Sequence, residues 1–504
     1  MQTTEVWTVE ESRLHDQEAQ AMGVNILWLM ETAGSRAAYY LLPELTGPGL
    51  VIVGKGHNGG DALVLARHLA RYREILVIMP LGTPGFPGAA DLVRAAQAYG
   101  VKIVEGIEPP VEWGYYRWVI DGVFGTGFHG IFDTDSPLGR LWHQLGDDNR
   151  PVYALDILSG LDANSGACGV EPVDATKTLT FGAAKWGHFG YPGARHTGQL
   201  VVLDIGLPHL GKSSGRWLDP SWAKSQMPVR DFYAHKYRRG TVAVIGGSET
   251  MPGAPVLAGL AALKAGAGLV ELFVPTQILH RIQAPAPLLV RGVENSAMMS
   301  AEDNDRLQRA DVIIVGPGLG PGASPGILAN LVKIGKPLVI DADGLRLLNT
   351  LALAKLPAGS VLTPHSGEMA RMLGITAQAV DADRPRAVNR ALDRFGAITV
   401  LKGAFSLIAG GRQIFINTAN TPALATAGSG DVLAGIIAAL LAGNASGDGV
   451  DTVALGTYLH GWAGIHSERR NGPSVIATDI IAAMGQSWQT ISHEEPPPSL
   501  PVSL

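Results

Sequence analysis

A short glycine-rich segment carries one carboxylate that could take part in catalysis. Residues 426–435 read TAGSGDVLAG and lead into the apolar residues 436–442, a pattern that predicts a tight loop followed by a buried helix. Gly428 and Gly430 lack Cβ atoms, so a ligand could approach the backbone closely. The free N–H groups of a first helical turn attract anions. Asp431 therefore has two interpretations: it caps the helix, or it is a base beside a bound phosphate.

Other loops in the same half of the chain place polar residues directly after apolar runs. Asp341 and Asp343 follow residues 338–340, and they either cap the next helix or belong to a site. His365 is more simply a hydrogen-bonded turn residue than a catalytic one. Lys402 is harder to explain structurally, because a buried strand seldom ends in lysine without an anion to meet. Together these residues favour an anion site near Asp431.

In the first half of the chain, three glycine-rich turns follow apolar runs. They read GKGHNGGD from Gly54, DGVFGTG from Asp121 and DILSGLD from Asp156. If the runs are parallel strands, their carboxyl ends bring Asn58, Asp121, Asp156 and Ser159 to one edge. Taken singly, each residue could instead cap a helix or tighten a turn. Together they favour a site, and oxygen ligands without histidine or cysteine suit a hard cation rather than zinc.

The elements that must position these residues alternate between short apolar runs and stretches with helical periodicity. This alternation predicts βαβ units and a mostly parallel sheet with helices on both faces. In the first half, the region 9–42 is helical with a break near Gly23, and a helix is expected over 62–72. The strands expected there are 50–53, 75–79, 101–104, 118–120, 152–155, 178–181 and 200–203.

A second series of strands follows a change in the pattern. These strands are expected at 241–245, 269–274, 311–315, 338–340, 361–363 and 398–401, with a hairpin of 405–409 and 413–417 around Gly410 and Gly411. Two nearly apolar helices are expected at 256–265 and 432–442. The stretch 211–237 lacks regular periodicity, so we place the linker there, at 216–221, between domains 1–215 and 222–492. Residues 493–504, with three consecutive prolines, are expected to form a flexible tail.

The composition limits the class of protein. A chain of 504 residues with 46% hydrophobic residues and 64 glycines indicates two or three α/β domains with many tight turns. Its formal net charge of −6 argues against a general nucleic-acid surface. Cys168 is the only cysteine, which excludes an internal disulfide and a thiolate zinc cluster. No apolar run reaches the roughly 18 residues of a membrane span and no export signal is present. We therefore expect a cytoplasmic enzyme with no membrane partner, and its alanine-rich apolar faces suggest a homo-oligomer.

The three turns of the first half, with the later TLTFGAAKWG and DIGLP, resemble the epimerase domain of NAD(P)H-hydrate repair proteins over residues 10–210. The resemblance implies a Rossmann-like three-layer domain. It implies a potassium ion held by Asn58, Asp121 and Ser159, and Asp156 as the acid/base that interconverts the R and S hydrates of NADH and NADPH. The substrate cradle implied by the resemblance comprises Asn58, Gly59, Gly60, Asp61, Gly125, Thr126, Gly127, Phe128, His129, Gly130, Ile131 and Asp156.

Six motifs of the second half resemble, in order, the ADP- or ATP-dependent NAD(P)H-hydrate dehydratases, which have a ribokinase-like α/β fold. They begin at Tyr237 and include GPGLG, DADGL, LTPHSGE, LKGA and TAGSGDVLAG. By this resemblance, Asp431 accepts the proton of the ring hydroxyl, which attacks the terminal phosphoryl group of the nucleotide while Mg²⁺ neutralises charge. The implied hydrate site comprises Ala254, Gly318, His365 and Asp431, and the implied adenine-nucleotide site comprises Lys402, Gly403, Ala404, Phe405, Ser406 and Gly430.

These resemblances predict a bifunctional repair enzyme. It would epimerise hydrated NADH and NADPH and restore NAD(P)H from the S form at the expense of ADP or ATP, releasing AMP or ADP and phosphate. Two alternatives stay open at this point. One is a ribokinase-like small-molecule kinase with an accessory domain. The other is a scaffold whose first half keeps the fold but not the chemistry, to which His57 and Leu158 point because the family usually has asparagine and proline there.

Overall fold

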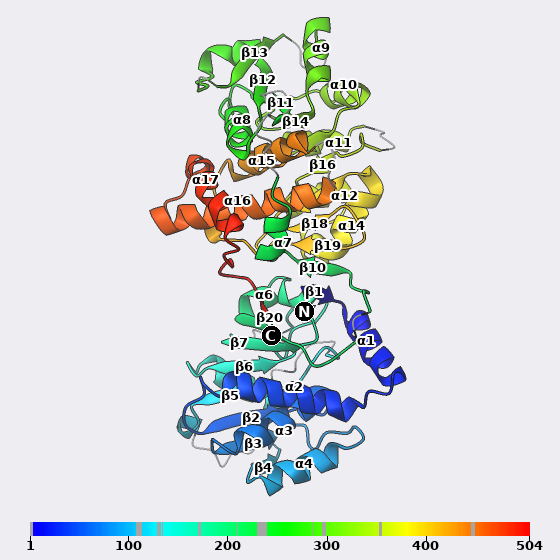
Figure 1. The fold of residues 1–504 in the computed structure, drawn as a ribbon, viewed down its shortest axis with the longest axis vertical. Coiled ribbons are helices and arrows are strands. Elements are labelled where there is room, and N and C mark those ends of the chain that lie inside the picture. Colours follow the sequence, from blue (N-terminus) through cyan, green and yellow to red (C-terminus); the bar gives the residue numbers. More distant parts are fainter. Residues whose placement is uncertain are drawn as a thin grey trace. The chain divides into compact units, whose positions relative to one another are not determined.

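The chain forms two compact units in the computed structural model. The first unit comprises Met1–Gly215 with Pro501–Leu504, and the second comprises Arg216–Leu500 (Figure 1). The structure describes residues 4–106, 113–128, 133, 135–169, 173–208, 210–228, 239–285, 287–294, 299–351, 355–444 and 449–503. Within these residues, each helix is too short or too polar to cross a membrane.

A parallel sheet of eight described strands forms the centre of the first unit. Its order is β20-β9-β7-β6-β5-β2-β3-β4, and neighbouring strands pair in parallel. The strands are β2 (Gly49–Val53), β3 (Ile75–Met79), β4 (Lys102–Glu105), β5 (Trp118–Gly122), β6 (Val152–Leu155), β7 (Lys177–Phe181), β9 (Gln199–Leu203) and β20 (Val502–Ser503). Seven of them match the apolar runs of the sequence, which confirms the predicted parallel arrangement.

Helices cover both faces of this sheet. Because successive residues of a strand point to opposite faces, alternate residues pack against different helices. Val51 and Val53 pack with the helices of one face, whereas Leu50 and Ile52 pack with α5 on the other. The first face carries α2 (Ile26–Leu41), α3 (His57–Leu69) and α4 (Ala89–Ala98), and the second carries α5 (Pro137–Gly146). The unit therefore has the predicted three layers. Its remaining elements are β1 (Glu5–Trp7), α1 (Val9–Ala21), η1 (Trp113–Tyr115), β8 (Ala184–Lys185), η2 (Trp186–His188) and α6 (Gly193–His196), and β1 pairs with β8.

The helix expected over 62–72 is wrong at both ends, since α3 begins at His57 and ends at Leu69. Gly59 and Gly60, which suggested a loop, lie in the first turn of α3. A Cβ atom at Gly59 would lie 2.0 Å from the carbonyl oxygen of Gly54, so this turn packs against the end of the preceding strand. Glycine is required here for close packing of a helix, and a sequence pattern does not distinguish this from a loop.

The strands of the second unit follow the order β13-β12-β11-β14-β15-β16-β17-β18-β19. They pair in parallel as far as β17, and β18 and β19 form the predicted antiparallel hairpin. The strands are β11 (Thr241–Ile245), β12 (Leu269–Pro275), β13 (Leu289–Val293), β14 (Val312–Val315), β15 (Leu338–Ile340), β16 (Val361–Leu362), β17 (Ile398–Leu401), β18 (Leu407–Ala409) and β19 (Ile414–Ile416).

One large apolar cluster joins this sheet to α8 (Ala254–Ala265), α15 (Ser429–Gly443), α16 (Gly449–Asn471) and α17 (Ala477–Ser492). These helices are rich in alanine and glycine, so their backbones approach closely, and the helices expected at 256–265 and 432–442 are both present. The other elements of the unit are α7 (Pro220–Ser225), η4 (Thr276–Arg281), α9 (Ala301–Arg309), α10 (Gly326–Ile334), α11 (Asp343–Leu348), α12 (Ser366–Leu373), α13 (Ala377–Ala382), α14 (Arg384–Phe395) and η5 (Pro422–Leu424).

Two segments expected to be irregular contain regular structure. Residues 216–221 hold the end of β10 (Gly215–Trp217) and the start of α7, whose first turn is capped by Asp219. Both elements are too short to show a period in the sequence. The expected flexible tail also needs correction, because Val502 and Ser503 add a strand beside β9 of the first unit.

Candidate active sites

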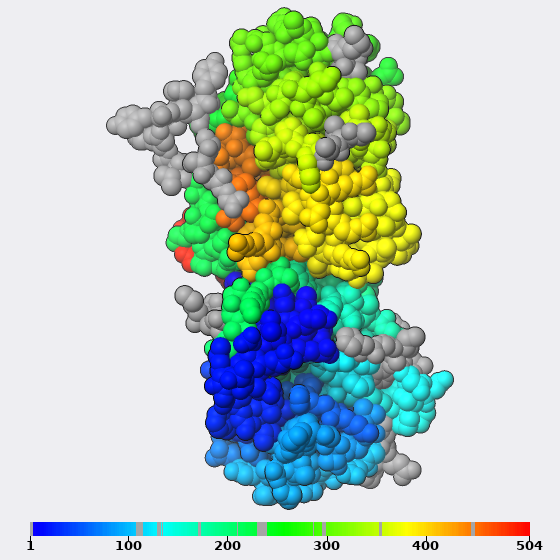
Figure 2. All heavy atoms as spheres, turned by 90° about the vertical axis from the view of Figure 1, so that its right-hand side faces the viewer, coloured from blue at the N-terminus to red at the C-terminus, as the bar shows by residue number. Residues whose placement is uncertain are grey.

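A cavity of about 900 Å³ opens at the carboxyl ends of the strands in the first unit. The loops after β2, β5 and β6 line it together with β8 and one side of α1. Its polar lining includes Asp16, Asn58, Asp61, Asp156 and Lys185. Figure 2 shows the amino-terminal residues, in dark blue, at the surface of this unit.

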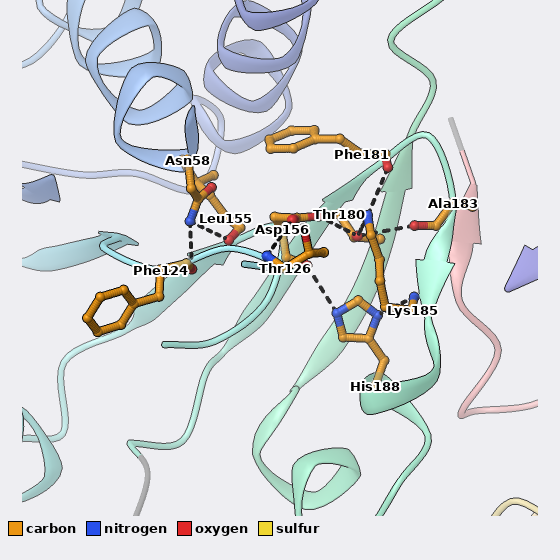
Figure 3. A network of polar contacts seen from close by, with 10 residues as sticks. All are labelled: Asn58, Phe124, Thr126, Leu155, Asp156, Thr180, Phe181, Ala183, Lys185 and His188. Carbon is orange, nitrogen blue, oxygen red and sulfur yellow. Dashed lines mark hydrogen bonds and ion pairs between the residues drawn. The ribbon is translucent and has the colours of Figure 1, made fainter. Parts of the chain in front are cut away.

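Asp156 follows β6 with a backbone φ of 62°, a left-handed conformation that is uncommon for a residue with a side chain. Its N–H donates to Leu179 at 2.7 Å, which fixes the turn to the neighbouring strand β7. Its Oδ1 atom accepts from Lys185 Nζ at 2.7 Å and lies 3.2 Å from the Thr180 hydroxyl (Figure 3). Its Oδ2 atom accepts from the Thr126 N–H at 3.3 Å. Several elements therefore hold this carboxylate at the cavity wall.

Sequence reasoning missed Lys185 and His188, which lie beside Asp156. Lys185 Nζ donates to Asp156, to the Thr180 hydroxyl at 2.8 Å and to the Phe181 carbonyl at 3.0 Å. His188 Nε2 donates to the Asp156 carbonyl at 3.0 Å, while its Nδ1 accepts from the Lys185 N–H. The sequence did contain a signal for Lys185, namely a lysine in an apolar strand. The same kind of signal led to the prediction for Lys402.

The charges around the cavity differ from one carboxylate to the next. Burial alone would raise the pKa of Asp156, but the Lys185 ammonium outweighs it and the pKa falls below 3.8. Burial, Asp156 and Asp16 raise the pKa of Asp61 well above that value, and burial raises the pKa of Asp16 to about 6. Burial and Lys185 lower the pKa of His188 to about 3, so the imidazole is neutral. Asp156 thus stays ionised at a lower pH than Asp16 or Asp61.

Asn58, Asp121 and Ser159 meet behind Asp156. The Asn58 amide donates to the carbonyls of Phe124 and Leu155, and Asp121 accepts from the N–H and hydroxyl of Ser159 at 2.7 Å each. Asn58 Oδ1 is buried and has no hydrogen-bond partner. Burial raises the pKa of Asp121 to about 6. Among the described residues, Asn58 Oδ1 thus lacks a hydrogen-bond partner, and the Asp121 carboxylate is buried. Oxygen atoms of this kind suit a monovalent cation.

Of the other predicted residues of the first unit, Asp61 and Gly125 to Phe128 line the same cavity, whereas Gly59 and Gly60 are not among its lining residues. Gly59, Gly60 and Asp61 lie in the first turn of α3, and Gly125 to Phe128 follow β5. The predicted residues His129, Gly130 and Ile131 lie outside the described residues. No cluster of three or more histidine, cysteine, aspartate or glutamate side chains among the described residues could hold a metal ion. A cation held by Asn58, Asp121 and Ser159 would therefore have one carboxylate among its ligands, together with amide and hydroxyl oxygens.

In the second unit, the glycine-rich loop begins α15. Gly428 is the N-cap residue with a φ of 83° and provides no side-chain cap, while Asp431 lies in the first turn. A Cβ atom at Gly430 would lie 3.1 Å from Asp341 Oδ2 and 3.3 Å from Lys402 Nζ. This glycine keeps open a space between two charged groups, which suits the close approach of a phosphate to the backbone.

Asp341 does not cap α11, contrary to one of its two interpretations. The N-cap residue is Ala342, whose φ is 48°. Asp341 is buried, and its Oδ1 atom accepts from Lys402 Nζ at 2.7 Å and from the Thr363 hydroxyl at 2.8 Å. Lys402 Nζ also lies 3.8 Å from Glu368 Oε2. Asp341 and Glu368 therefore supply at least part of the negative charge that was expected beside Lys402.

Desolvation raises the pKa of Asp431 to about 7, and the negative charge of Asp341 adds to the increase. His365 caps α12 through its Nδ1 atom, which accepts from the Gly367 N–H, so its turn interpretation is correct. Its Nε2 atom lies 3.5 Å from Glu368, which joins it to the Lys402 cluster. The loop 402–406 follows β17, and the Ser406 hydroxyl lies 3.2 Å from the carbonyl of Gly403.

Gly318 and Ala254 come from different loops but lie together. A Cβ atom at Gly318 would lie 3.0 Å from the Ala254 Cβ and 2.6 Å from the Met251 carbonyl. The loop that starts α8 also reaches the glycine-rich loop, because a Cβ atom at Gly428 would lie 2.6 Å from Leu257. Lys402 and Asp341 therefore lie beside the start of α15, and α8, whose first residue lies against Gly318, packs against Gly428.

Two family profiles match the chain. The family described as NAD(P)H-hydrate dehydratase matches residues 242–486, and that described as YjeF-related protein N-terminus matches residues 27–187. Among solved structures, a ribokinase-like superfamily protein of Enterococcus faecalis is 26% identical, with a TM-score of 0.50, and the match covers 56% of this chain and 99% of that one. An ADP/ATP-dependent NAD(P)H-hydrate dehydratase of Bacillus subtilis, co-crystallised with ATP/Mg²⁺, is 25% identical with a TM-score of 0.48 over 54% and 97%.

Full-length relatives carry both parts. The bifunctional NAD(P)H-hydrate repair enzyme of Moorella thermoacetica is 36% identical over 505 residues, covering 92% of this chain and 93% of the relative. The enzyme of the same name from Thermofilum pendens is 33% identical over 96% of each chain. These matches confirm the resemblance of both halves and the α/β fold class. The chain belongs to the family of bifunctional NAD(P)H-hydrate repair enzymes, which combine an epimerase with an ADP/ATP-dependent dehydratase.

Proposed function

We propose that the two reactions divide between the two halves of the chain, with epimerisation in residues 1–215 and dehydration in residues 222–492. The observation that carries the first assignment is the ionised Asp156 at the wall of a cavity that is large enough for a nucleotide. Asp156 accepts the proton of the ring hydroxyl of hydrated NADH or NADPH, the oxygen forms a carbonyl, and the ring C–N bond breaks with its electron pair on the nitrogen. The nitrogen then closes the ring on the other face of the carbonyl, and Asp156 returns the proton to the oxygen.

Asn58, Asp121 and Ser159 would hold a potassium ion in the first unit. The free Asn58 Oδ1 atom and the buried Asp121 carboxylate support this choice. A bound cation supplies positive charge beside the cavity and fixes the loops that follow β5 and β6. The cradle comprises the first turn of α3 and the predicted residues 125–131.

In the second unit, Asp431 takes the proton of the ring hydroxyl of the S hydrate, and the hydroxyl oxygen attacks the terminal phosphoryl group of ADP or ATP. A pKa near 7 suits a base that works at neutral pH. The N–H groups at the start of α15 then stabilise the charge on the transferred group, and Mg²⁺ enters with the nucleotide. AMP or ADP is the leaving group of this transfer. Phosphate then departs from the hydrated carbon and the adjacent ring carbon loses a proton, which re-forms the double bond of NAD(P)H.

The hydrate would contact Ala254, Gly318 and His365, and the nucleotide would contact residues 402–406 with Gly430. The position of Lys402 beside Gly430 at the start of α15 supports the division. Lys402, paired with Asp341, would hold phosphate oxygens as a point charge. Two copies of the chain or more are expected to associate, as its alanine-rich helices suggest.

A single assay separates this function from a small-molecule kinase. The purified protein is incubated with the S hydrate, Mg²⁺ and either ADP or ATP, and both the absorbance of the dihydronicotinamide ring and the phosphorus products are followed. We expect the absorbance to return as free phosphate appears. A stable product that keeps the phosphoryl group would instead support a kinase.

A further inference from the structure

Lys185 is buried to an unusual degree for a lysine beside a cavity. Its side chain is 3% exposed, against 14% for the side chain of Asp156. All three protons of its ammonium group have acceptors: Asp156 Oδ1, the Thr180 hydroxyl and the Phe181 carbonyl (Figure 3). A buried lysine pays a large desolvation cost, and this complete set of partners offsets it. The ammonium group is therefore held in one place.

The two oxygens of Asp156 have unequal surroundings. Oδ1 is held by Lys185 at 2.7 Å and lies 3.2 Å from the Thr180 hydroxyl, which also contacts the Ala183 carbonyl. Among the described residues, Oδ2 accepts one long hydrogen bond, from the Thr126 N–H at 3.3 Å. A Cβ atom at Gly125 would lie 3.3 Å from Oδ2, so the glycine leaves the approach to this oxygen open.

We propose that Lys185 is a positioning residue for epimerisation: it holds Oδ1 of Asp156 and leaves Oδ2 as the oxygen that exchanges a proton with the substrate hydroxyl. This inference rests on the proposed role of Asp156. The proton passes from the hydroxyl oxygen to Oδ2 as the oxygen forms a carbonyl and the ring C–N bond breaks. It returns to the oxygen when the nitrogen has closed the ring on the other face. Lys185 gives up no proton in this exchange.

The other charged groups that face Asp156 could not replace Lys185. Asp16 approaches from α1 and Asp61 from α3, and neither carboxyl group can supply a positive charge. His188 on η2 is neutral, since burial and the nearby Lys185 charge lower its pKa to about 3. Without Lys185, Asp156 would be a partly buried carboxylate beside two others, so its pKa would rise towards neutrality. Protonated Asp156 cannot act as the base.

This arrangement predicts a change in pH dependence rather than a simple loss of rate. Removing an opposite charge within 4 Å typically shifts a pKa by about 1 to 3 units. In the variant Lys185→Met, we expect the acidic limb of R-to-S conversion to move up by at least about one pH unit. Activity should then fall towards pH 5, where the wild type is unaffected, and should recover as the pH rises. Lys185→Arg keeps the positive charge and should move the limb back towards its wild-type position.

The experiment uses the full-length protein and follows each epimer by NMR between pH 5 and 9, after subtraction of the uncatalysed rate. Dehydration of the S hydrate by the same molecules shows that each variant is folded. Lys177→Met is the matched control, because Lys177 is also a strand lysine paired with a carboxylate, Glu44, but does not contact Asp156. We expect the epimerisation profile of this control to be unchanged.

Two results would overturn the inference. One is a Lys185→Met profile that coincides with that of the wild type, and the other is a loss of epimerisation at every pH while dehydration is normal. Asp156→Asn, measured in parallel, distinguishes this failure from failure of the proposed function. If Asp156→Asn still epimerises, the role of Asp156 itself is wrong. If Asp156→Asn is inactive and Lys185→Met is unshifted, only the role of Lys185 is wrong.

Discussion

Asp156 and Asp431 are both partly withdrawn from water, but the charge beside each one differs. Asp156 has the Lys185 ammonium in direct contact, and its pKa lies below 3.8. Asp431 has lost solvent and faces the carboxylate of Asp341, and its pKa rises to about 7. An opposite charge favours ionisation, whereas desolvation and a like charge oppose it. The two reactions should therefore respond differently to pH.

Dehydration should weaken as the pH falls below about 7, because Asp431 must be ionised to accept a proton. Asp341→Asn removes a like charge and frees Lys402, and both changes lower the pKa of Asp431. We expect the acidic limb of the dehydration profile to move to lower pH in this variant, even if the maximal rate falls. Asp343→Asn is the control, since Asp343 accepts from the Gly320 N–H and is not among the groups that shift Asp431. A limb that stays in place in Asp341→Asn would contradict this account.

The proposed cation site predicts a dependence on potassium in the first unit alone. Replacing potassium by a large organic cation should lower epimerisation and leave dehydration of the S hydrate unchanged at the same ionic strength. Potassium should also raise the melting temperature of the first unit, because a ligand that binds only the native state stabilises it. Asp121→Asn should remove that increase. An equal melting temperature with and without potassium, measured by calorimetry, would argue against the site.

At the scale of elements, the start of α15 is positioned by close packing against α8. A Cβ atom at Gly435 would lie 2.2 Å from the carbonyl oxygen of Ala258, so Gly435→Ala would push the two helices apart. We expect this change to lower the free energy of unfolding by about 1 to 3 kcal/mol. Dehydration should fall as the loop before α15 moves.

Gly485→Ala is the matched substitution on α17. A Cβ atom there would meet nothing within 4 Å. Replacing an exposed helical glycine by alanine should raise the free energy of unfolding by up to about 1 kcal/mol. Chemical denaturation of both variants tests the pair, and equal effects of the two changes would refute the packing argument.

Much of the fold was predictable because long apolar runs have a recognisable period. The strands around Asn58, Asp121 and Asp156 were expected, and so was their meeting at one edge, since adjacent parallel strands end together. The short strands β1, β8, β10 and β20 were not predicted, because two or three residues carry no period. The first turn of α3 was missed because its glycines serve close packing.

The candidate sites were predictable to a different extent. Sequence reasoning found single residues at strand ends but not the partners that shift their pKa values. Asp156 and Lys185, for example, are 29 residues apart, and nothing in the spacing of the sequence shows that they are in contact. Lys185, which contacts Asp156, lies on a short strand, and Asp341, which contacts Lys402, has a second plausible role as a helix cap. Knowledge of the fold was needed to pair them. The roles of the predicted site residues, the potassium ion and the oligomeric state stay predictions.

At the scale of the whole molecule, each unit has its own apolar cores. If the two sites work separately, an Asp156→Asn chain and an Asp431→Asn chain should complement each other in a mixture. The second variant would supply the S epimer through solution, and the first would dehydrate it. Full recovery of NADH from a racemic hydrate by the mixture is the expected result. Recovery limited to the initial S share would show that complementation fails.

The central claim is that Asp156 and Asp431 serve separate reactions on one chain. The most direct measurement follows both epimers of the hydrate and the restored NADH by NMR, with ADP or ATP and Mg²⁺ present. The wild type should consume both epimers. Asp156→Asn should consume the S epimer at the wild-type initial rate and leave the R epimer to its uncatalysed conversion, whereas Asp431→Asn should interconvert the epimers and form no NADH. Loss of both reactions in either folded variant, or of neither, would contradict the account.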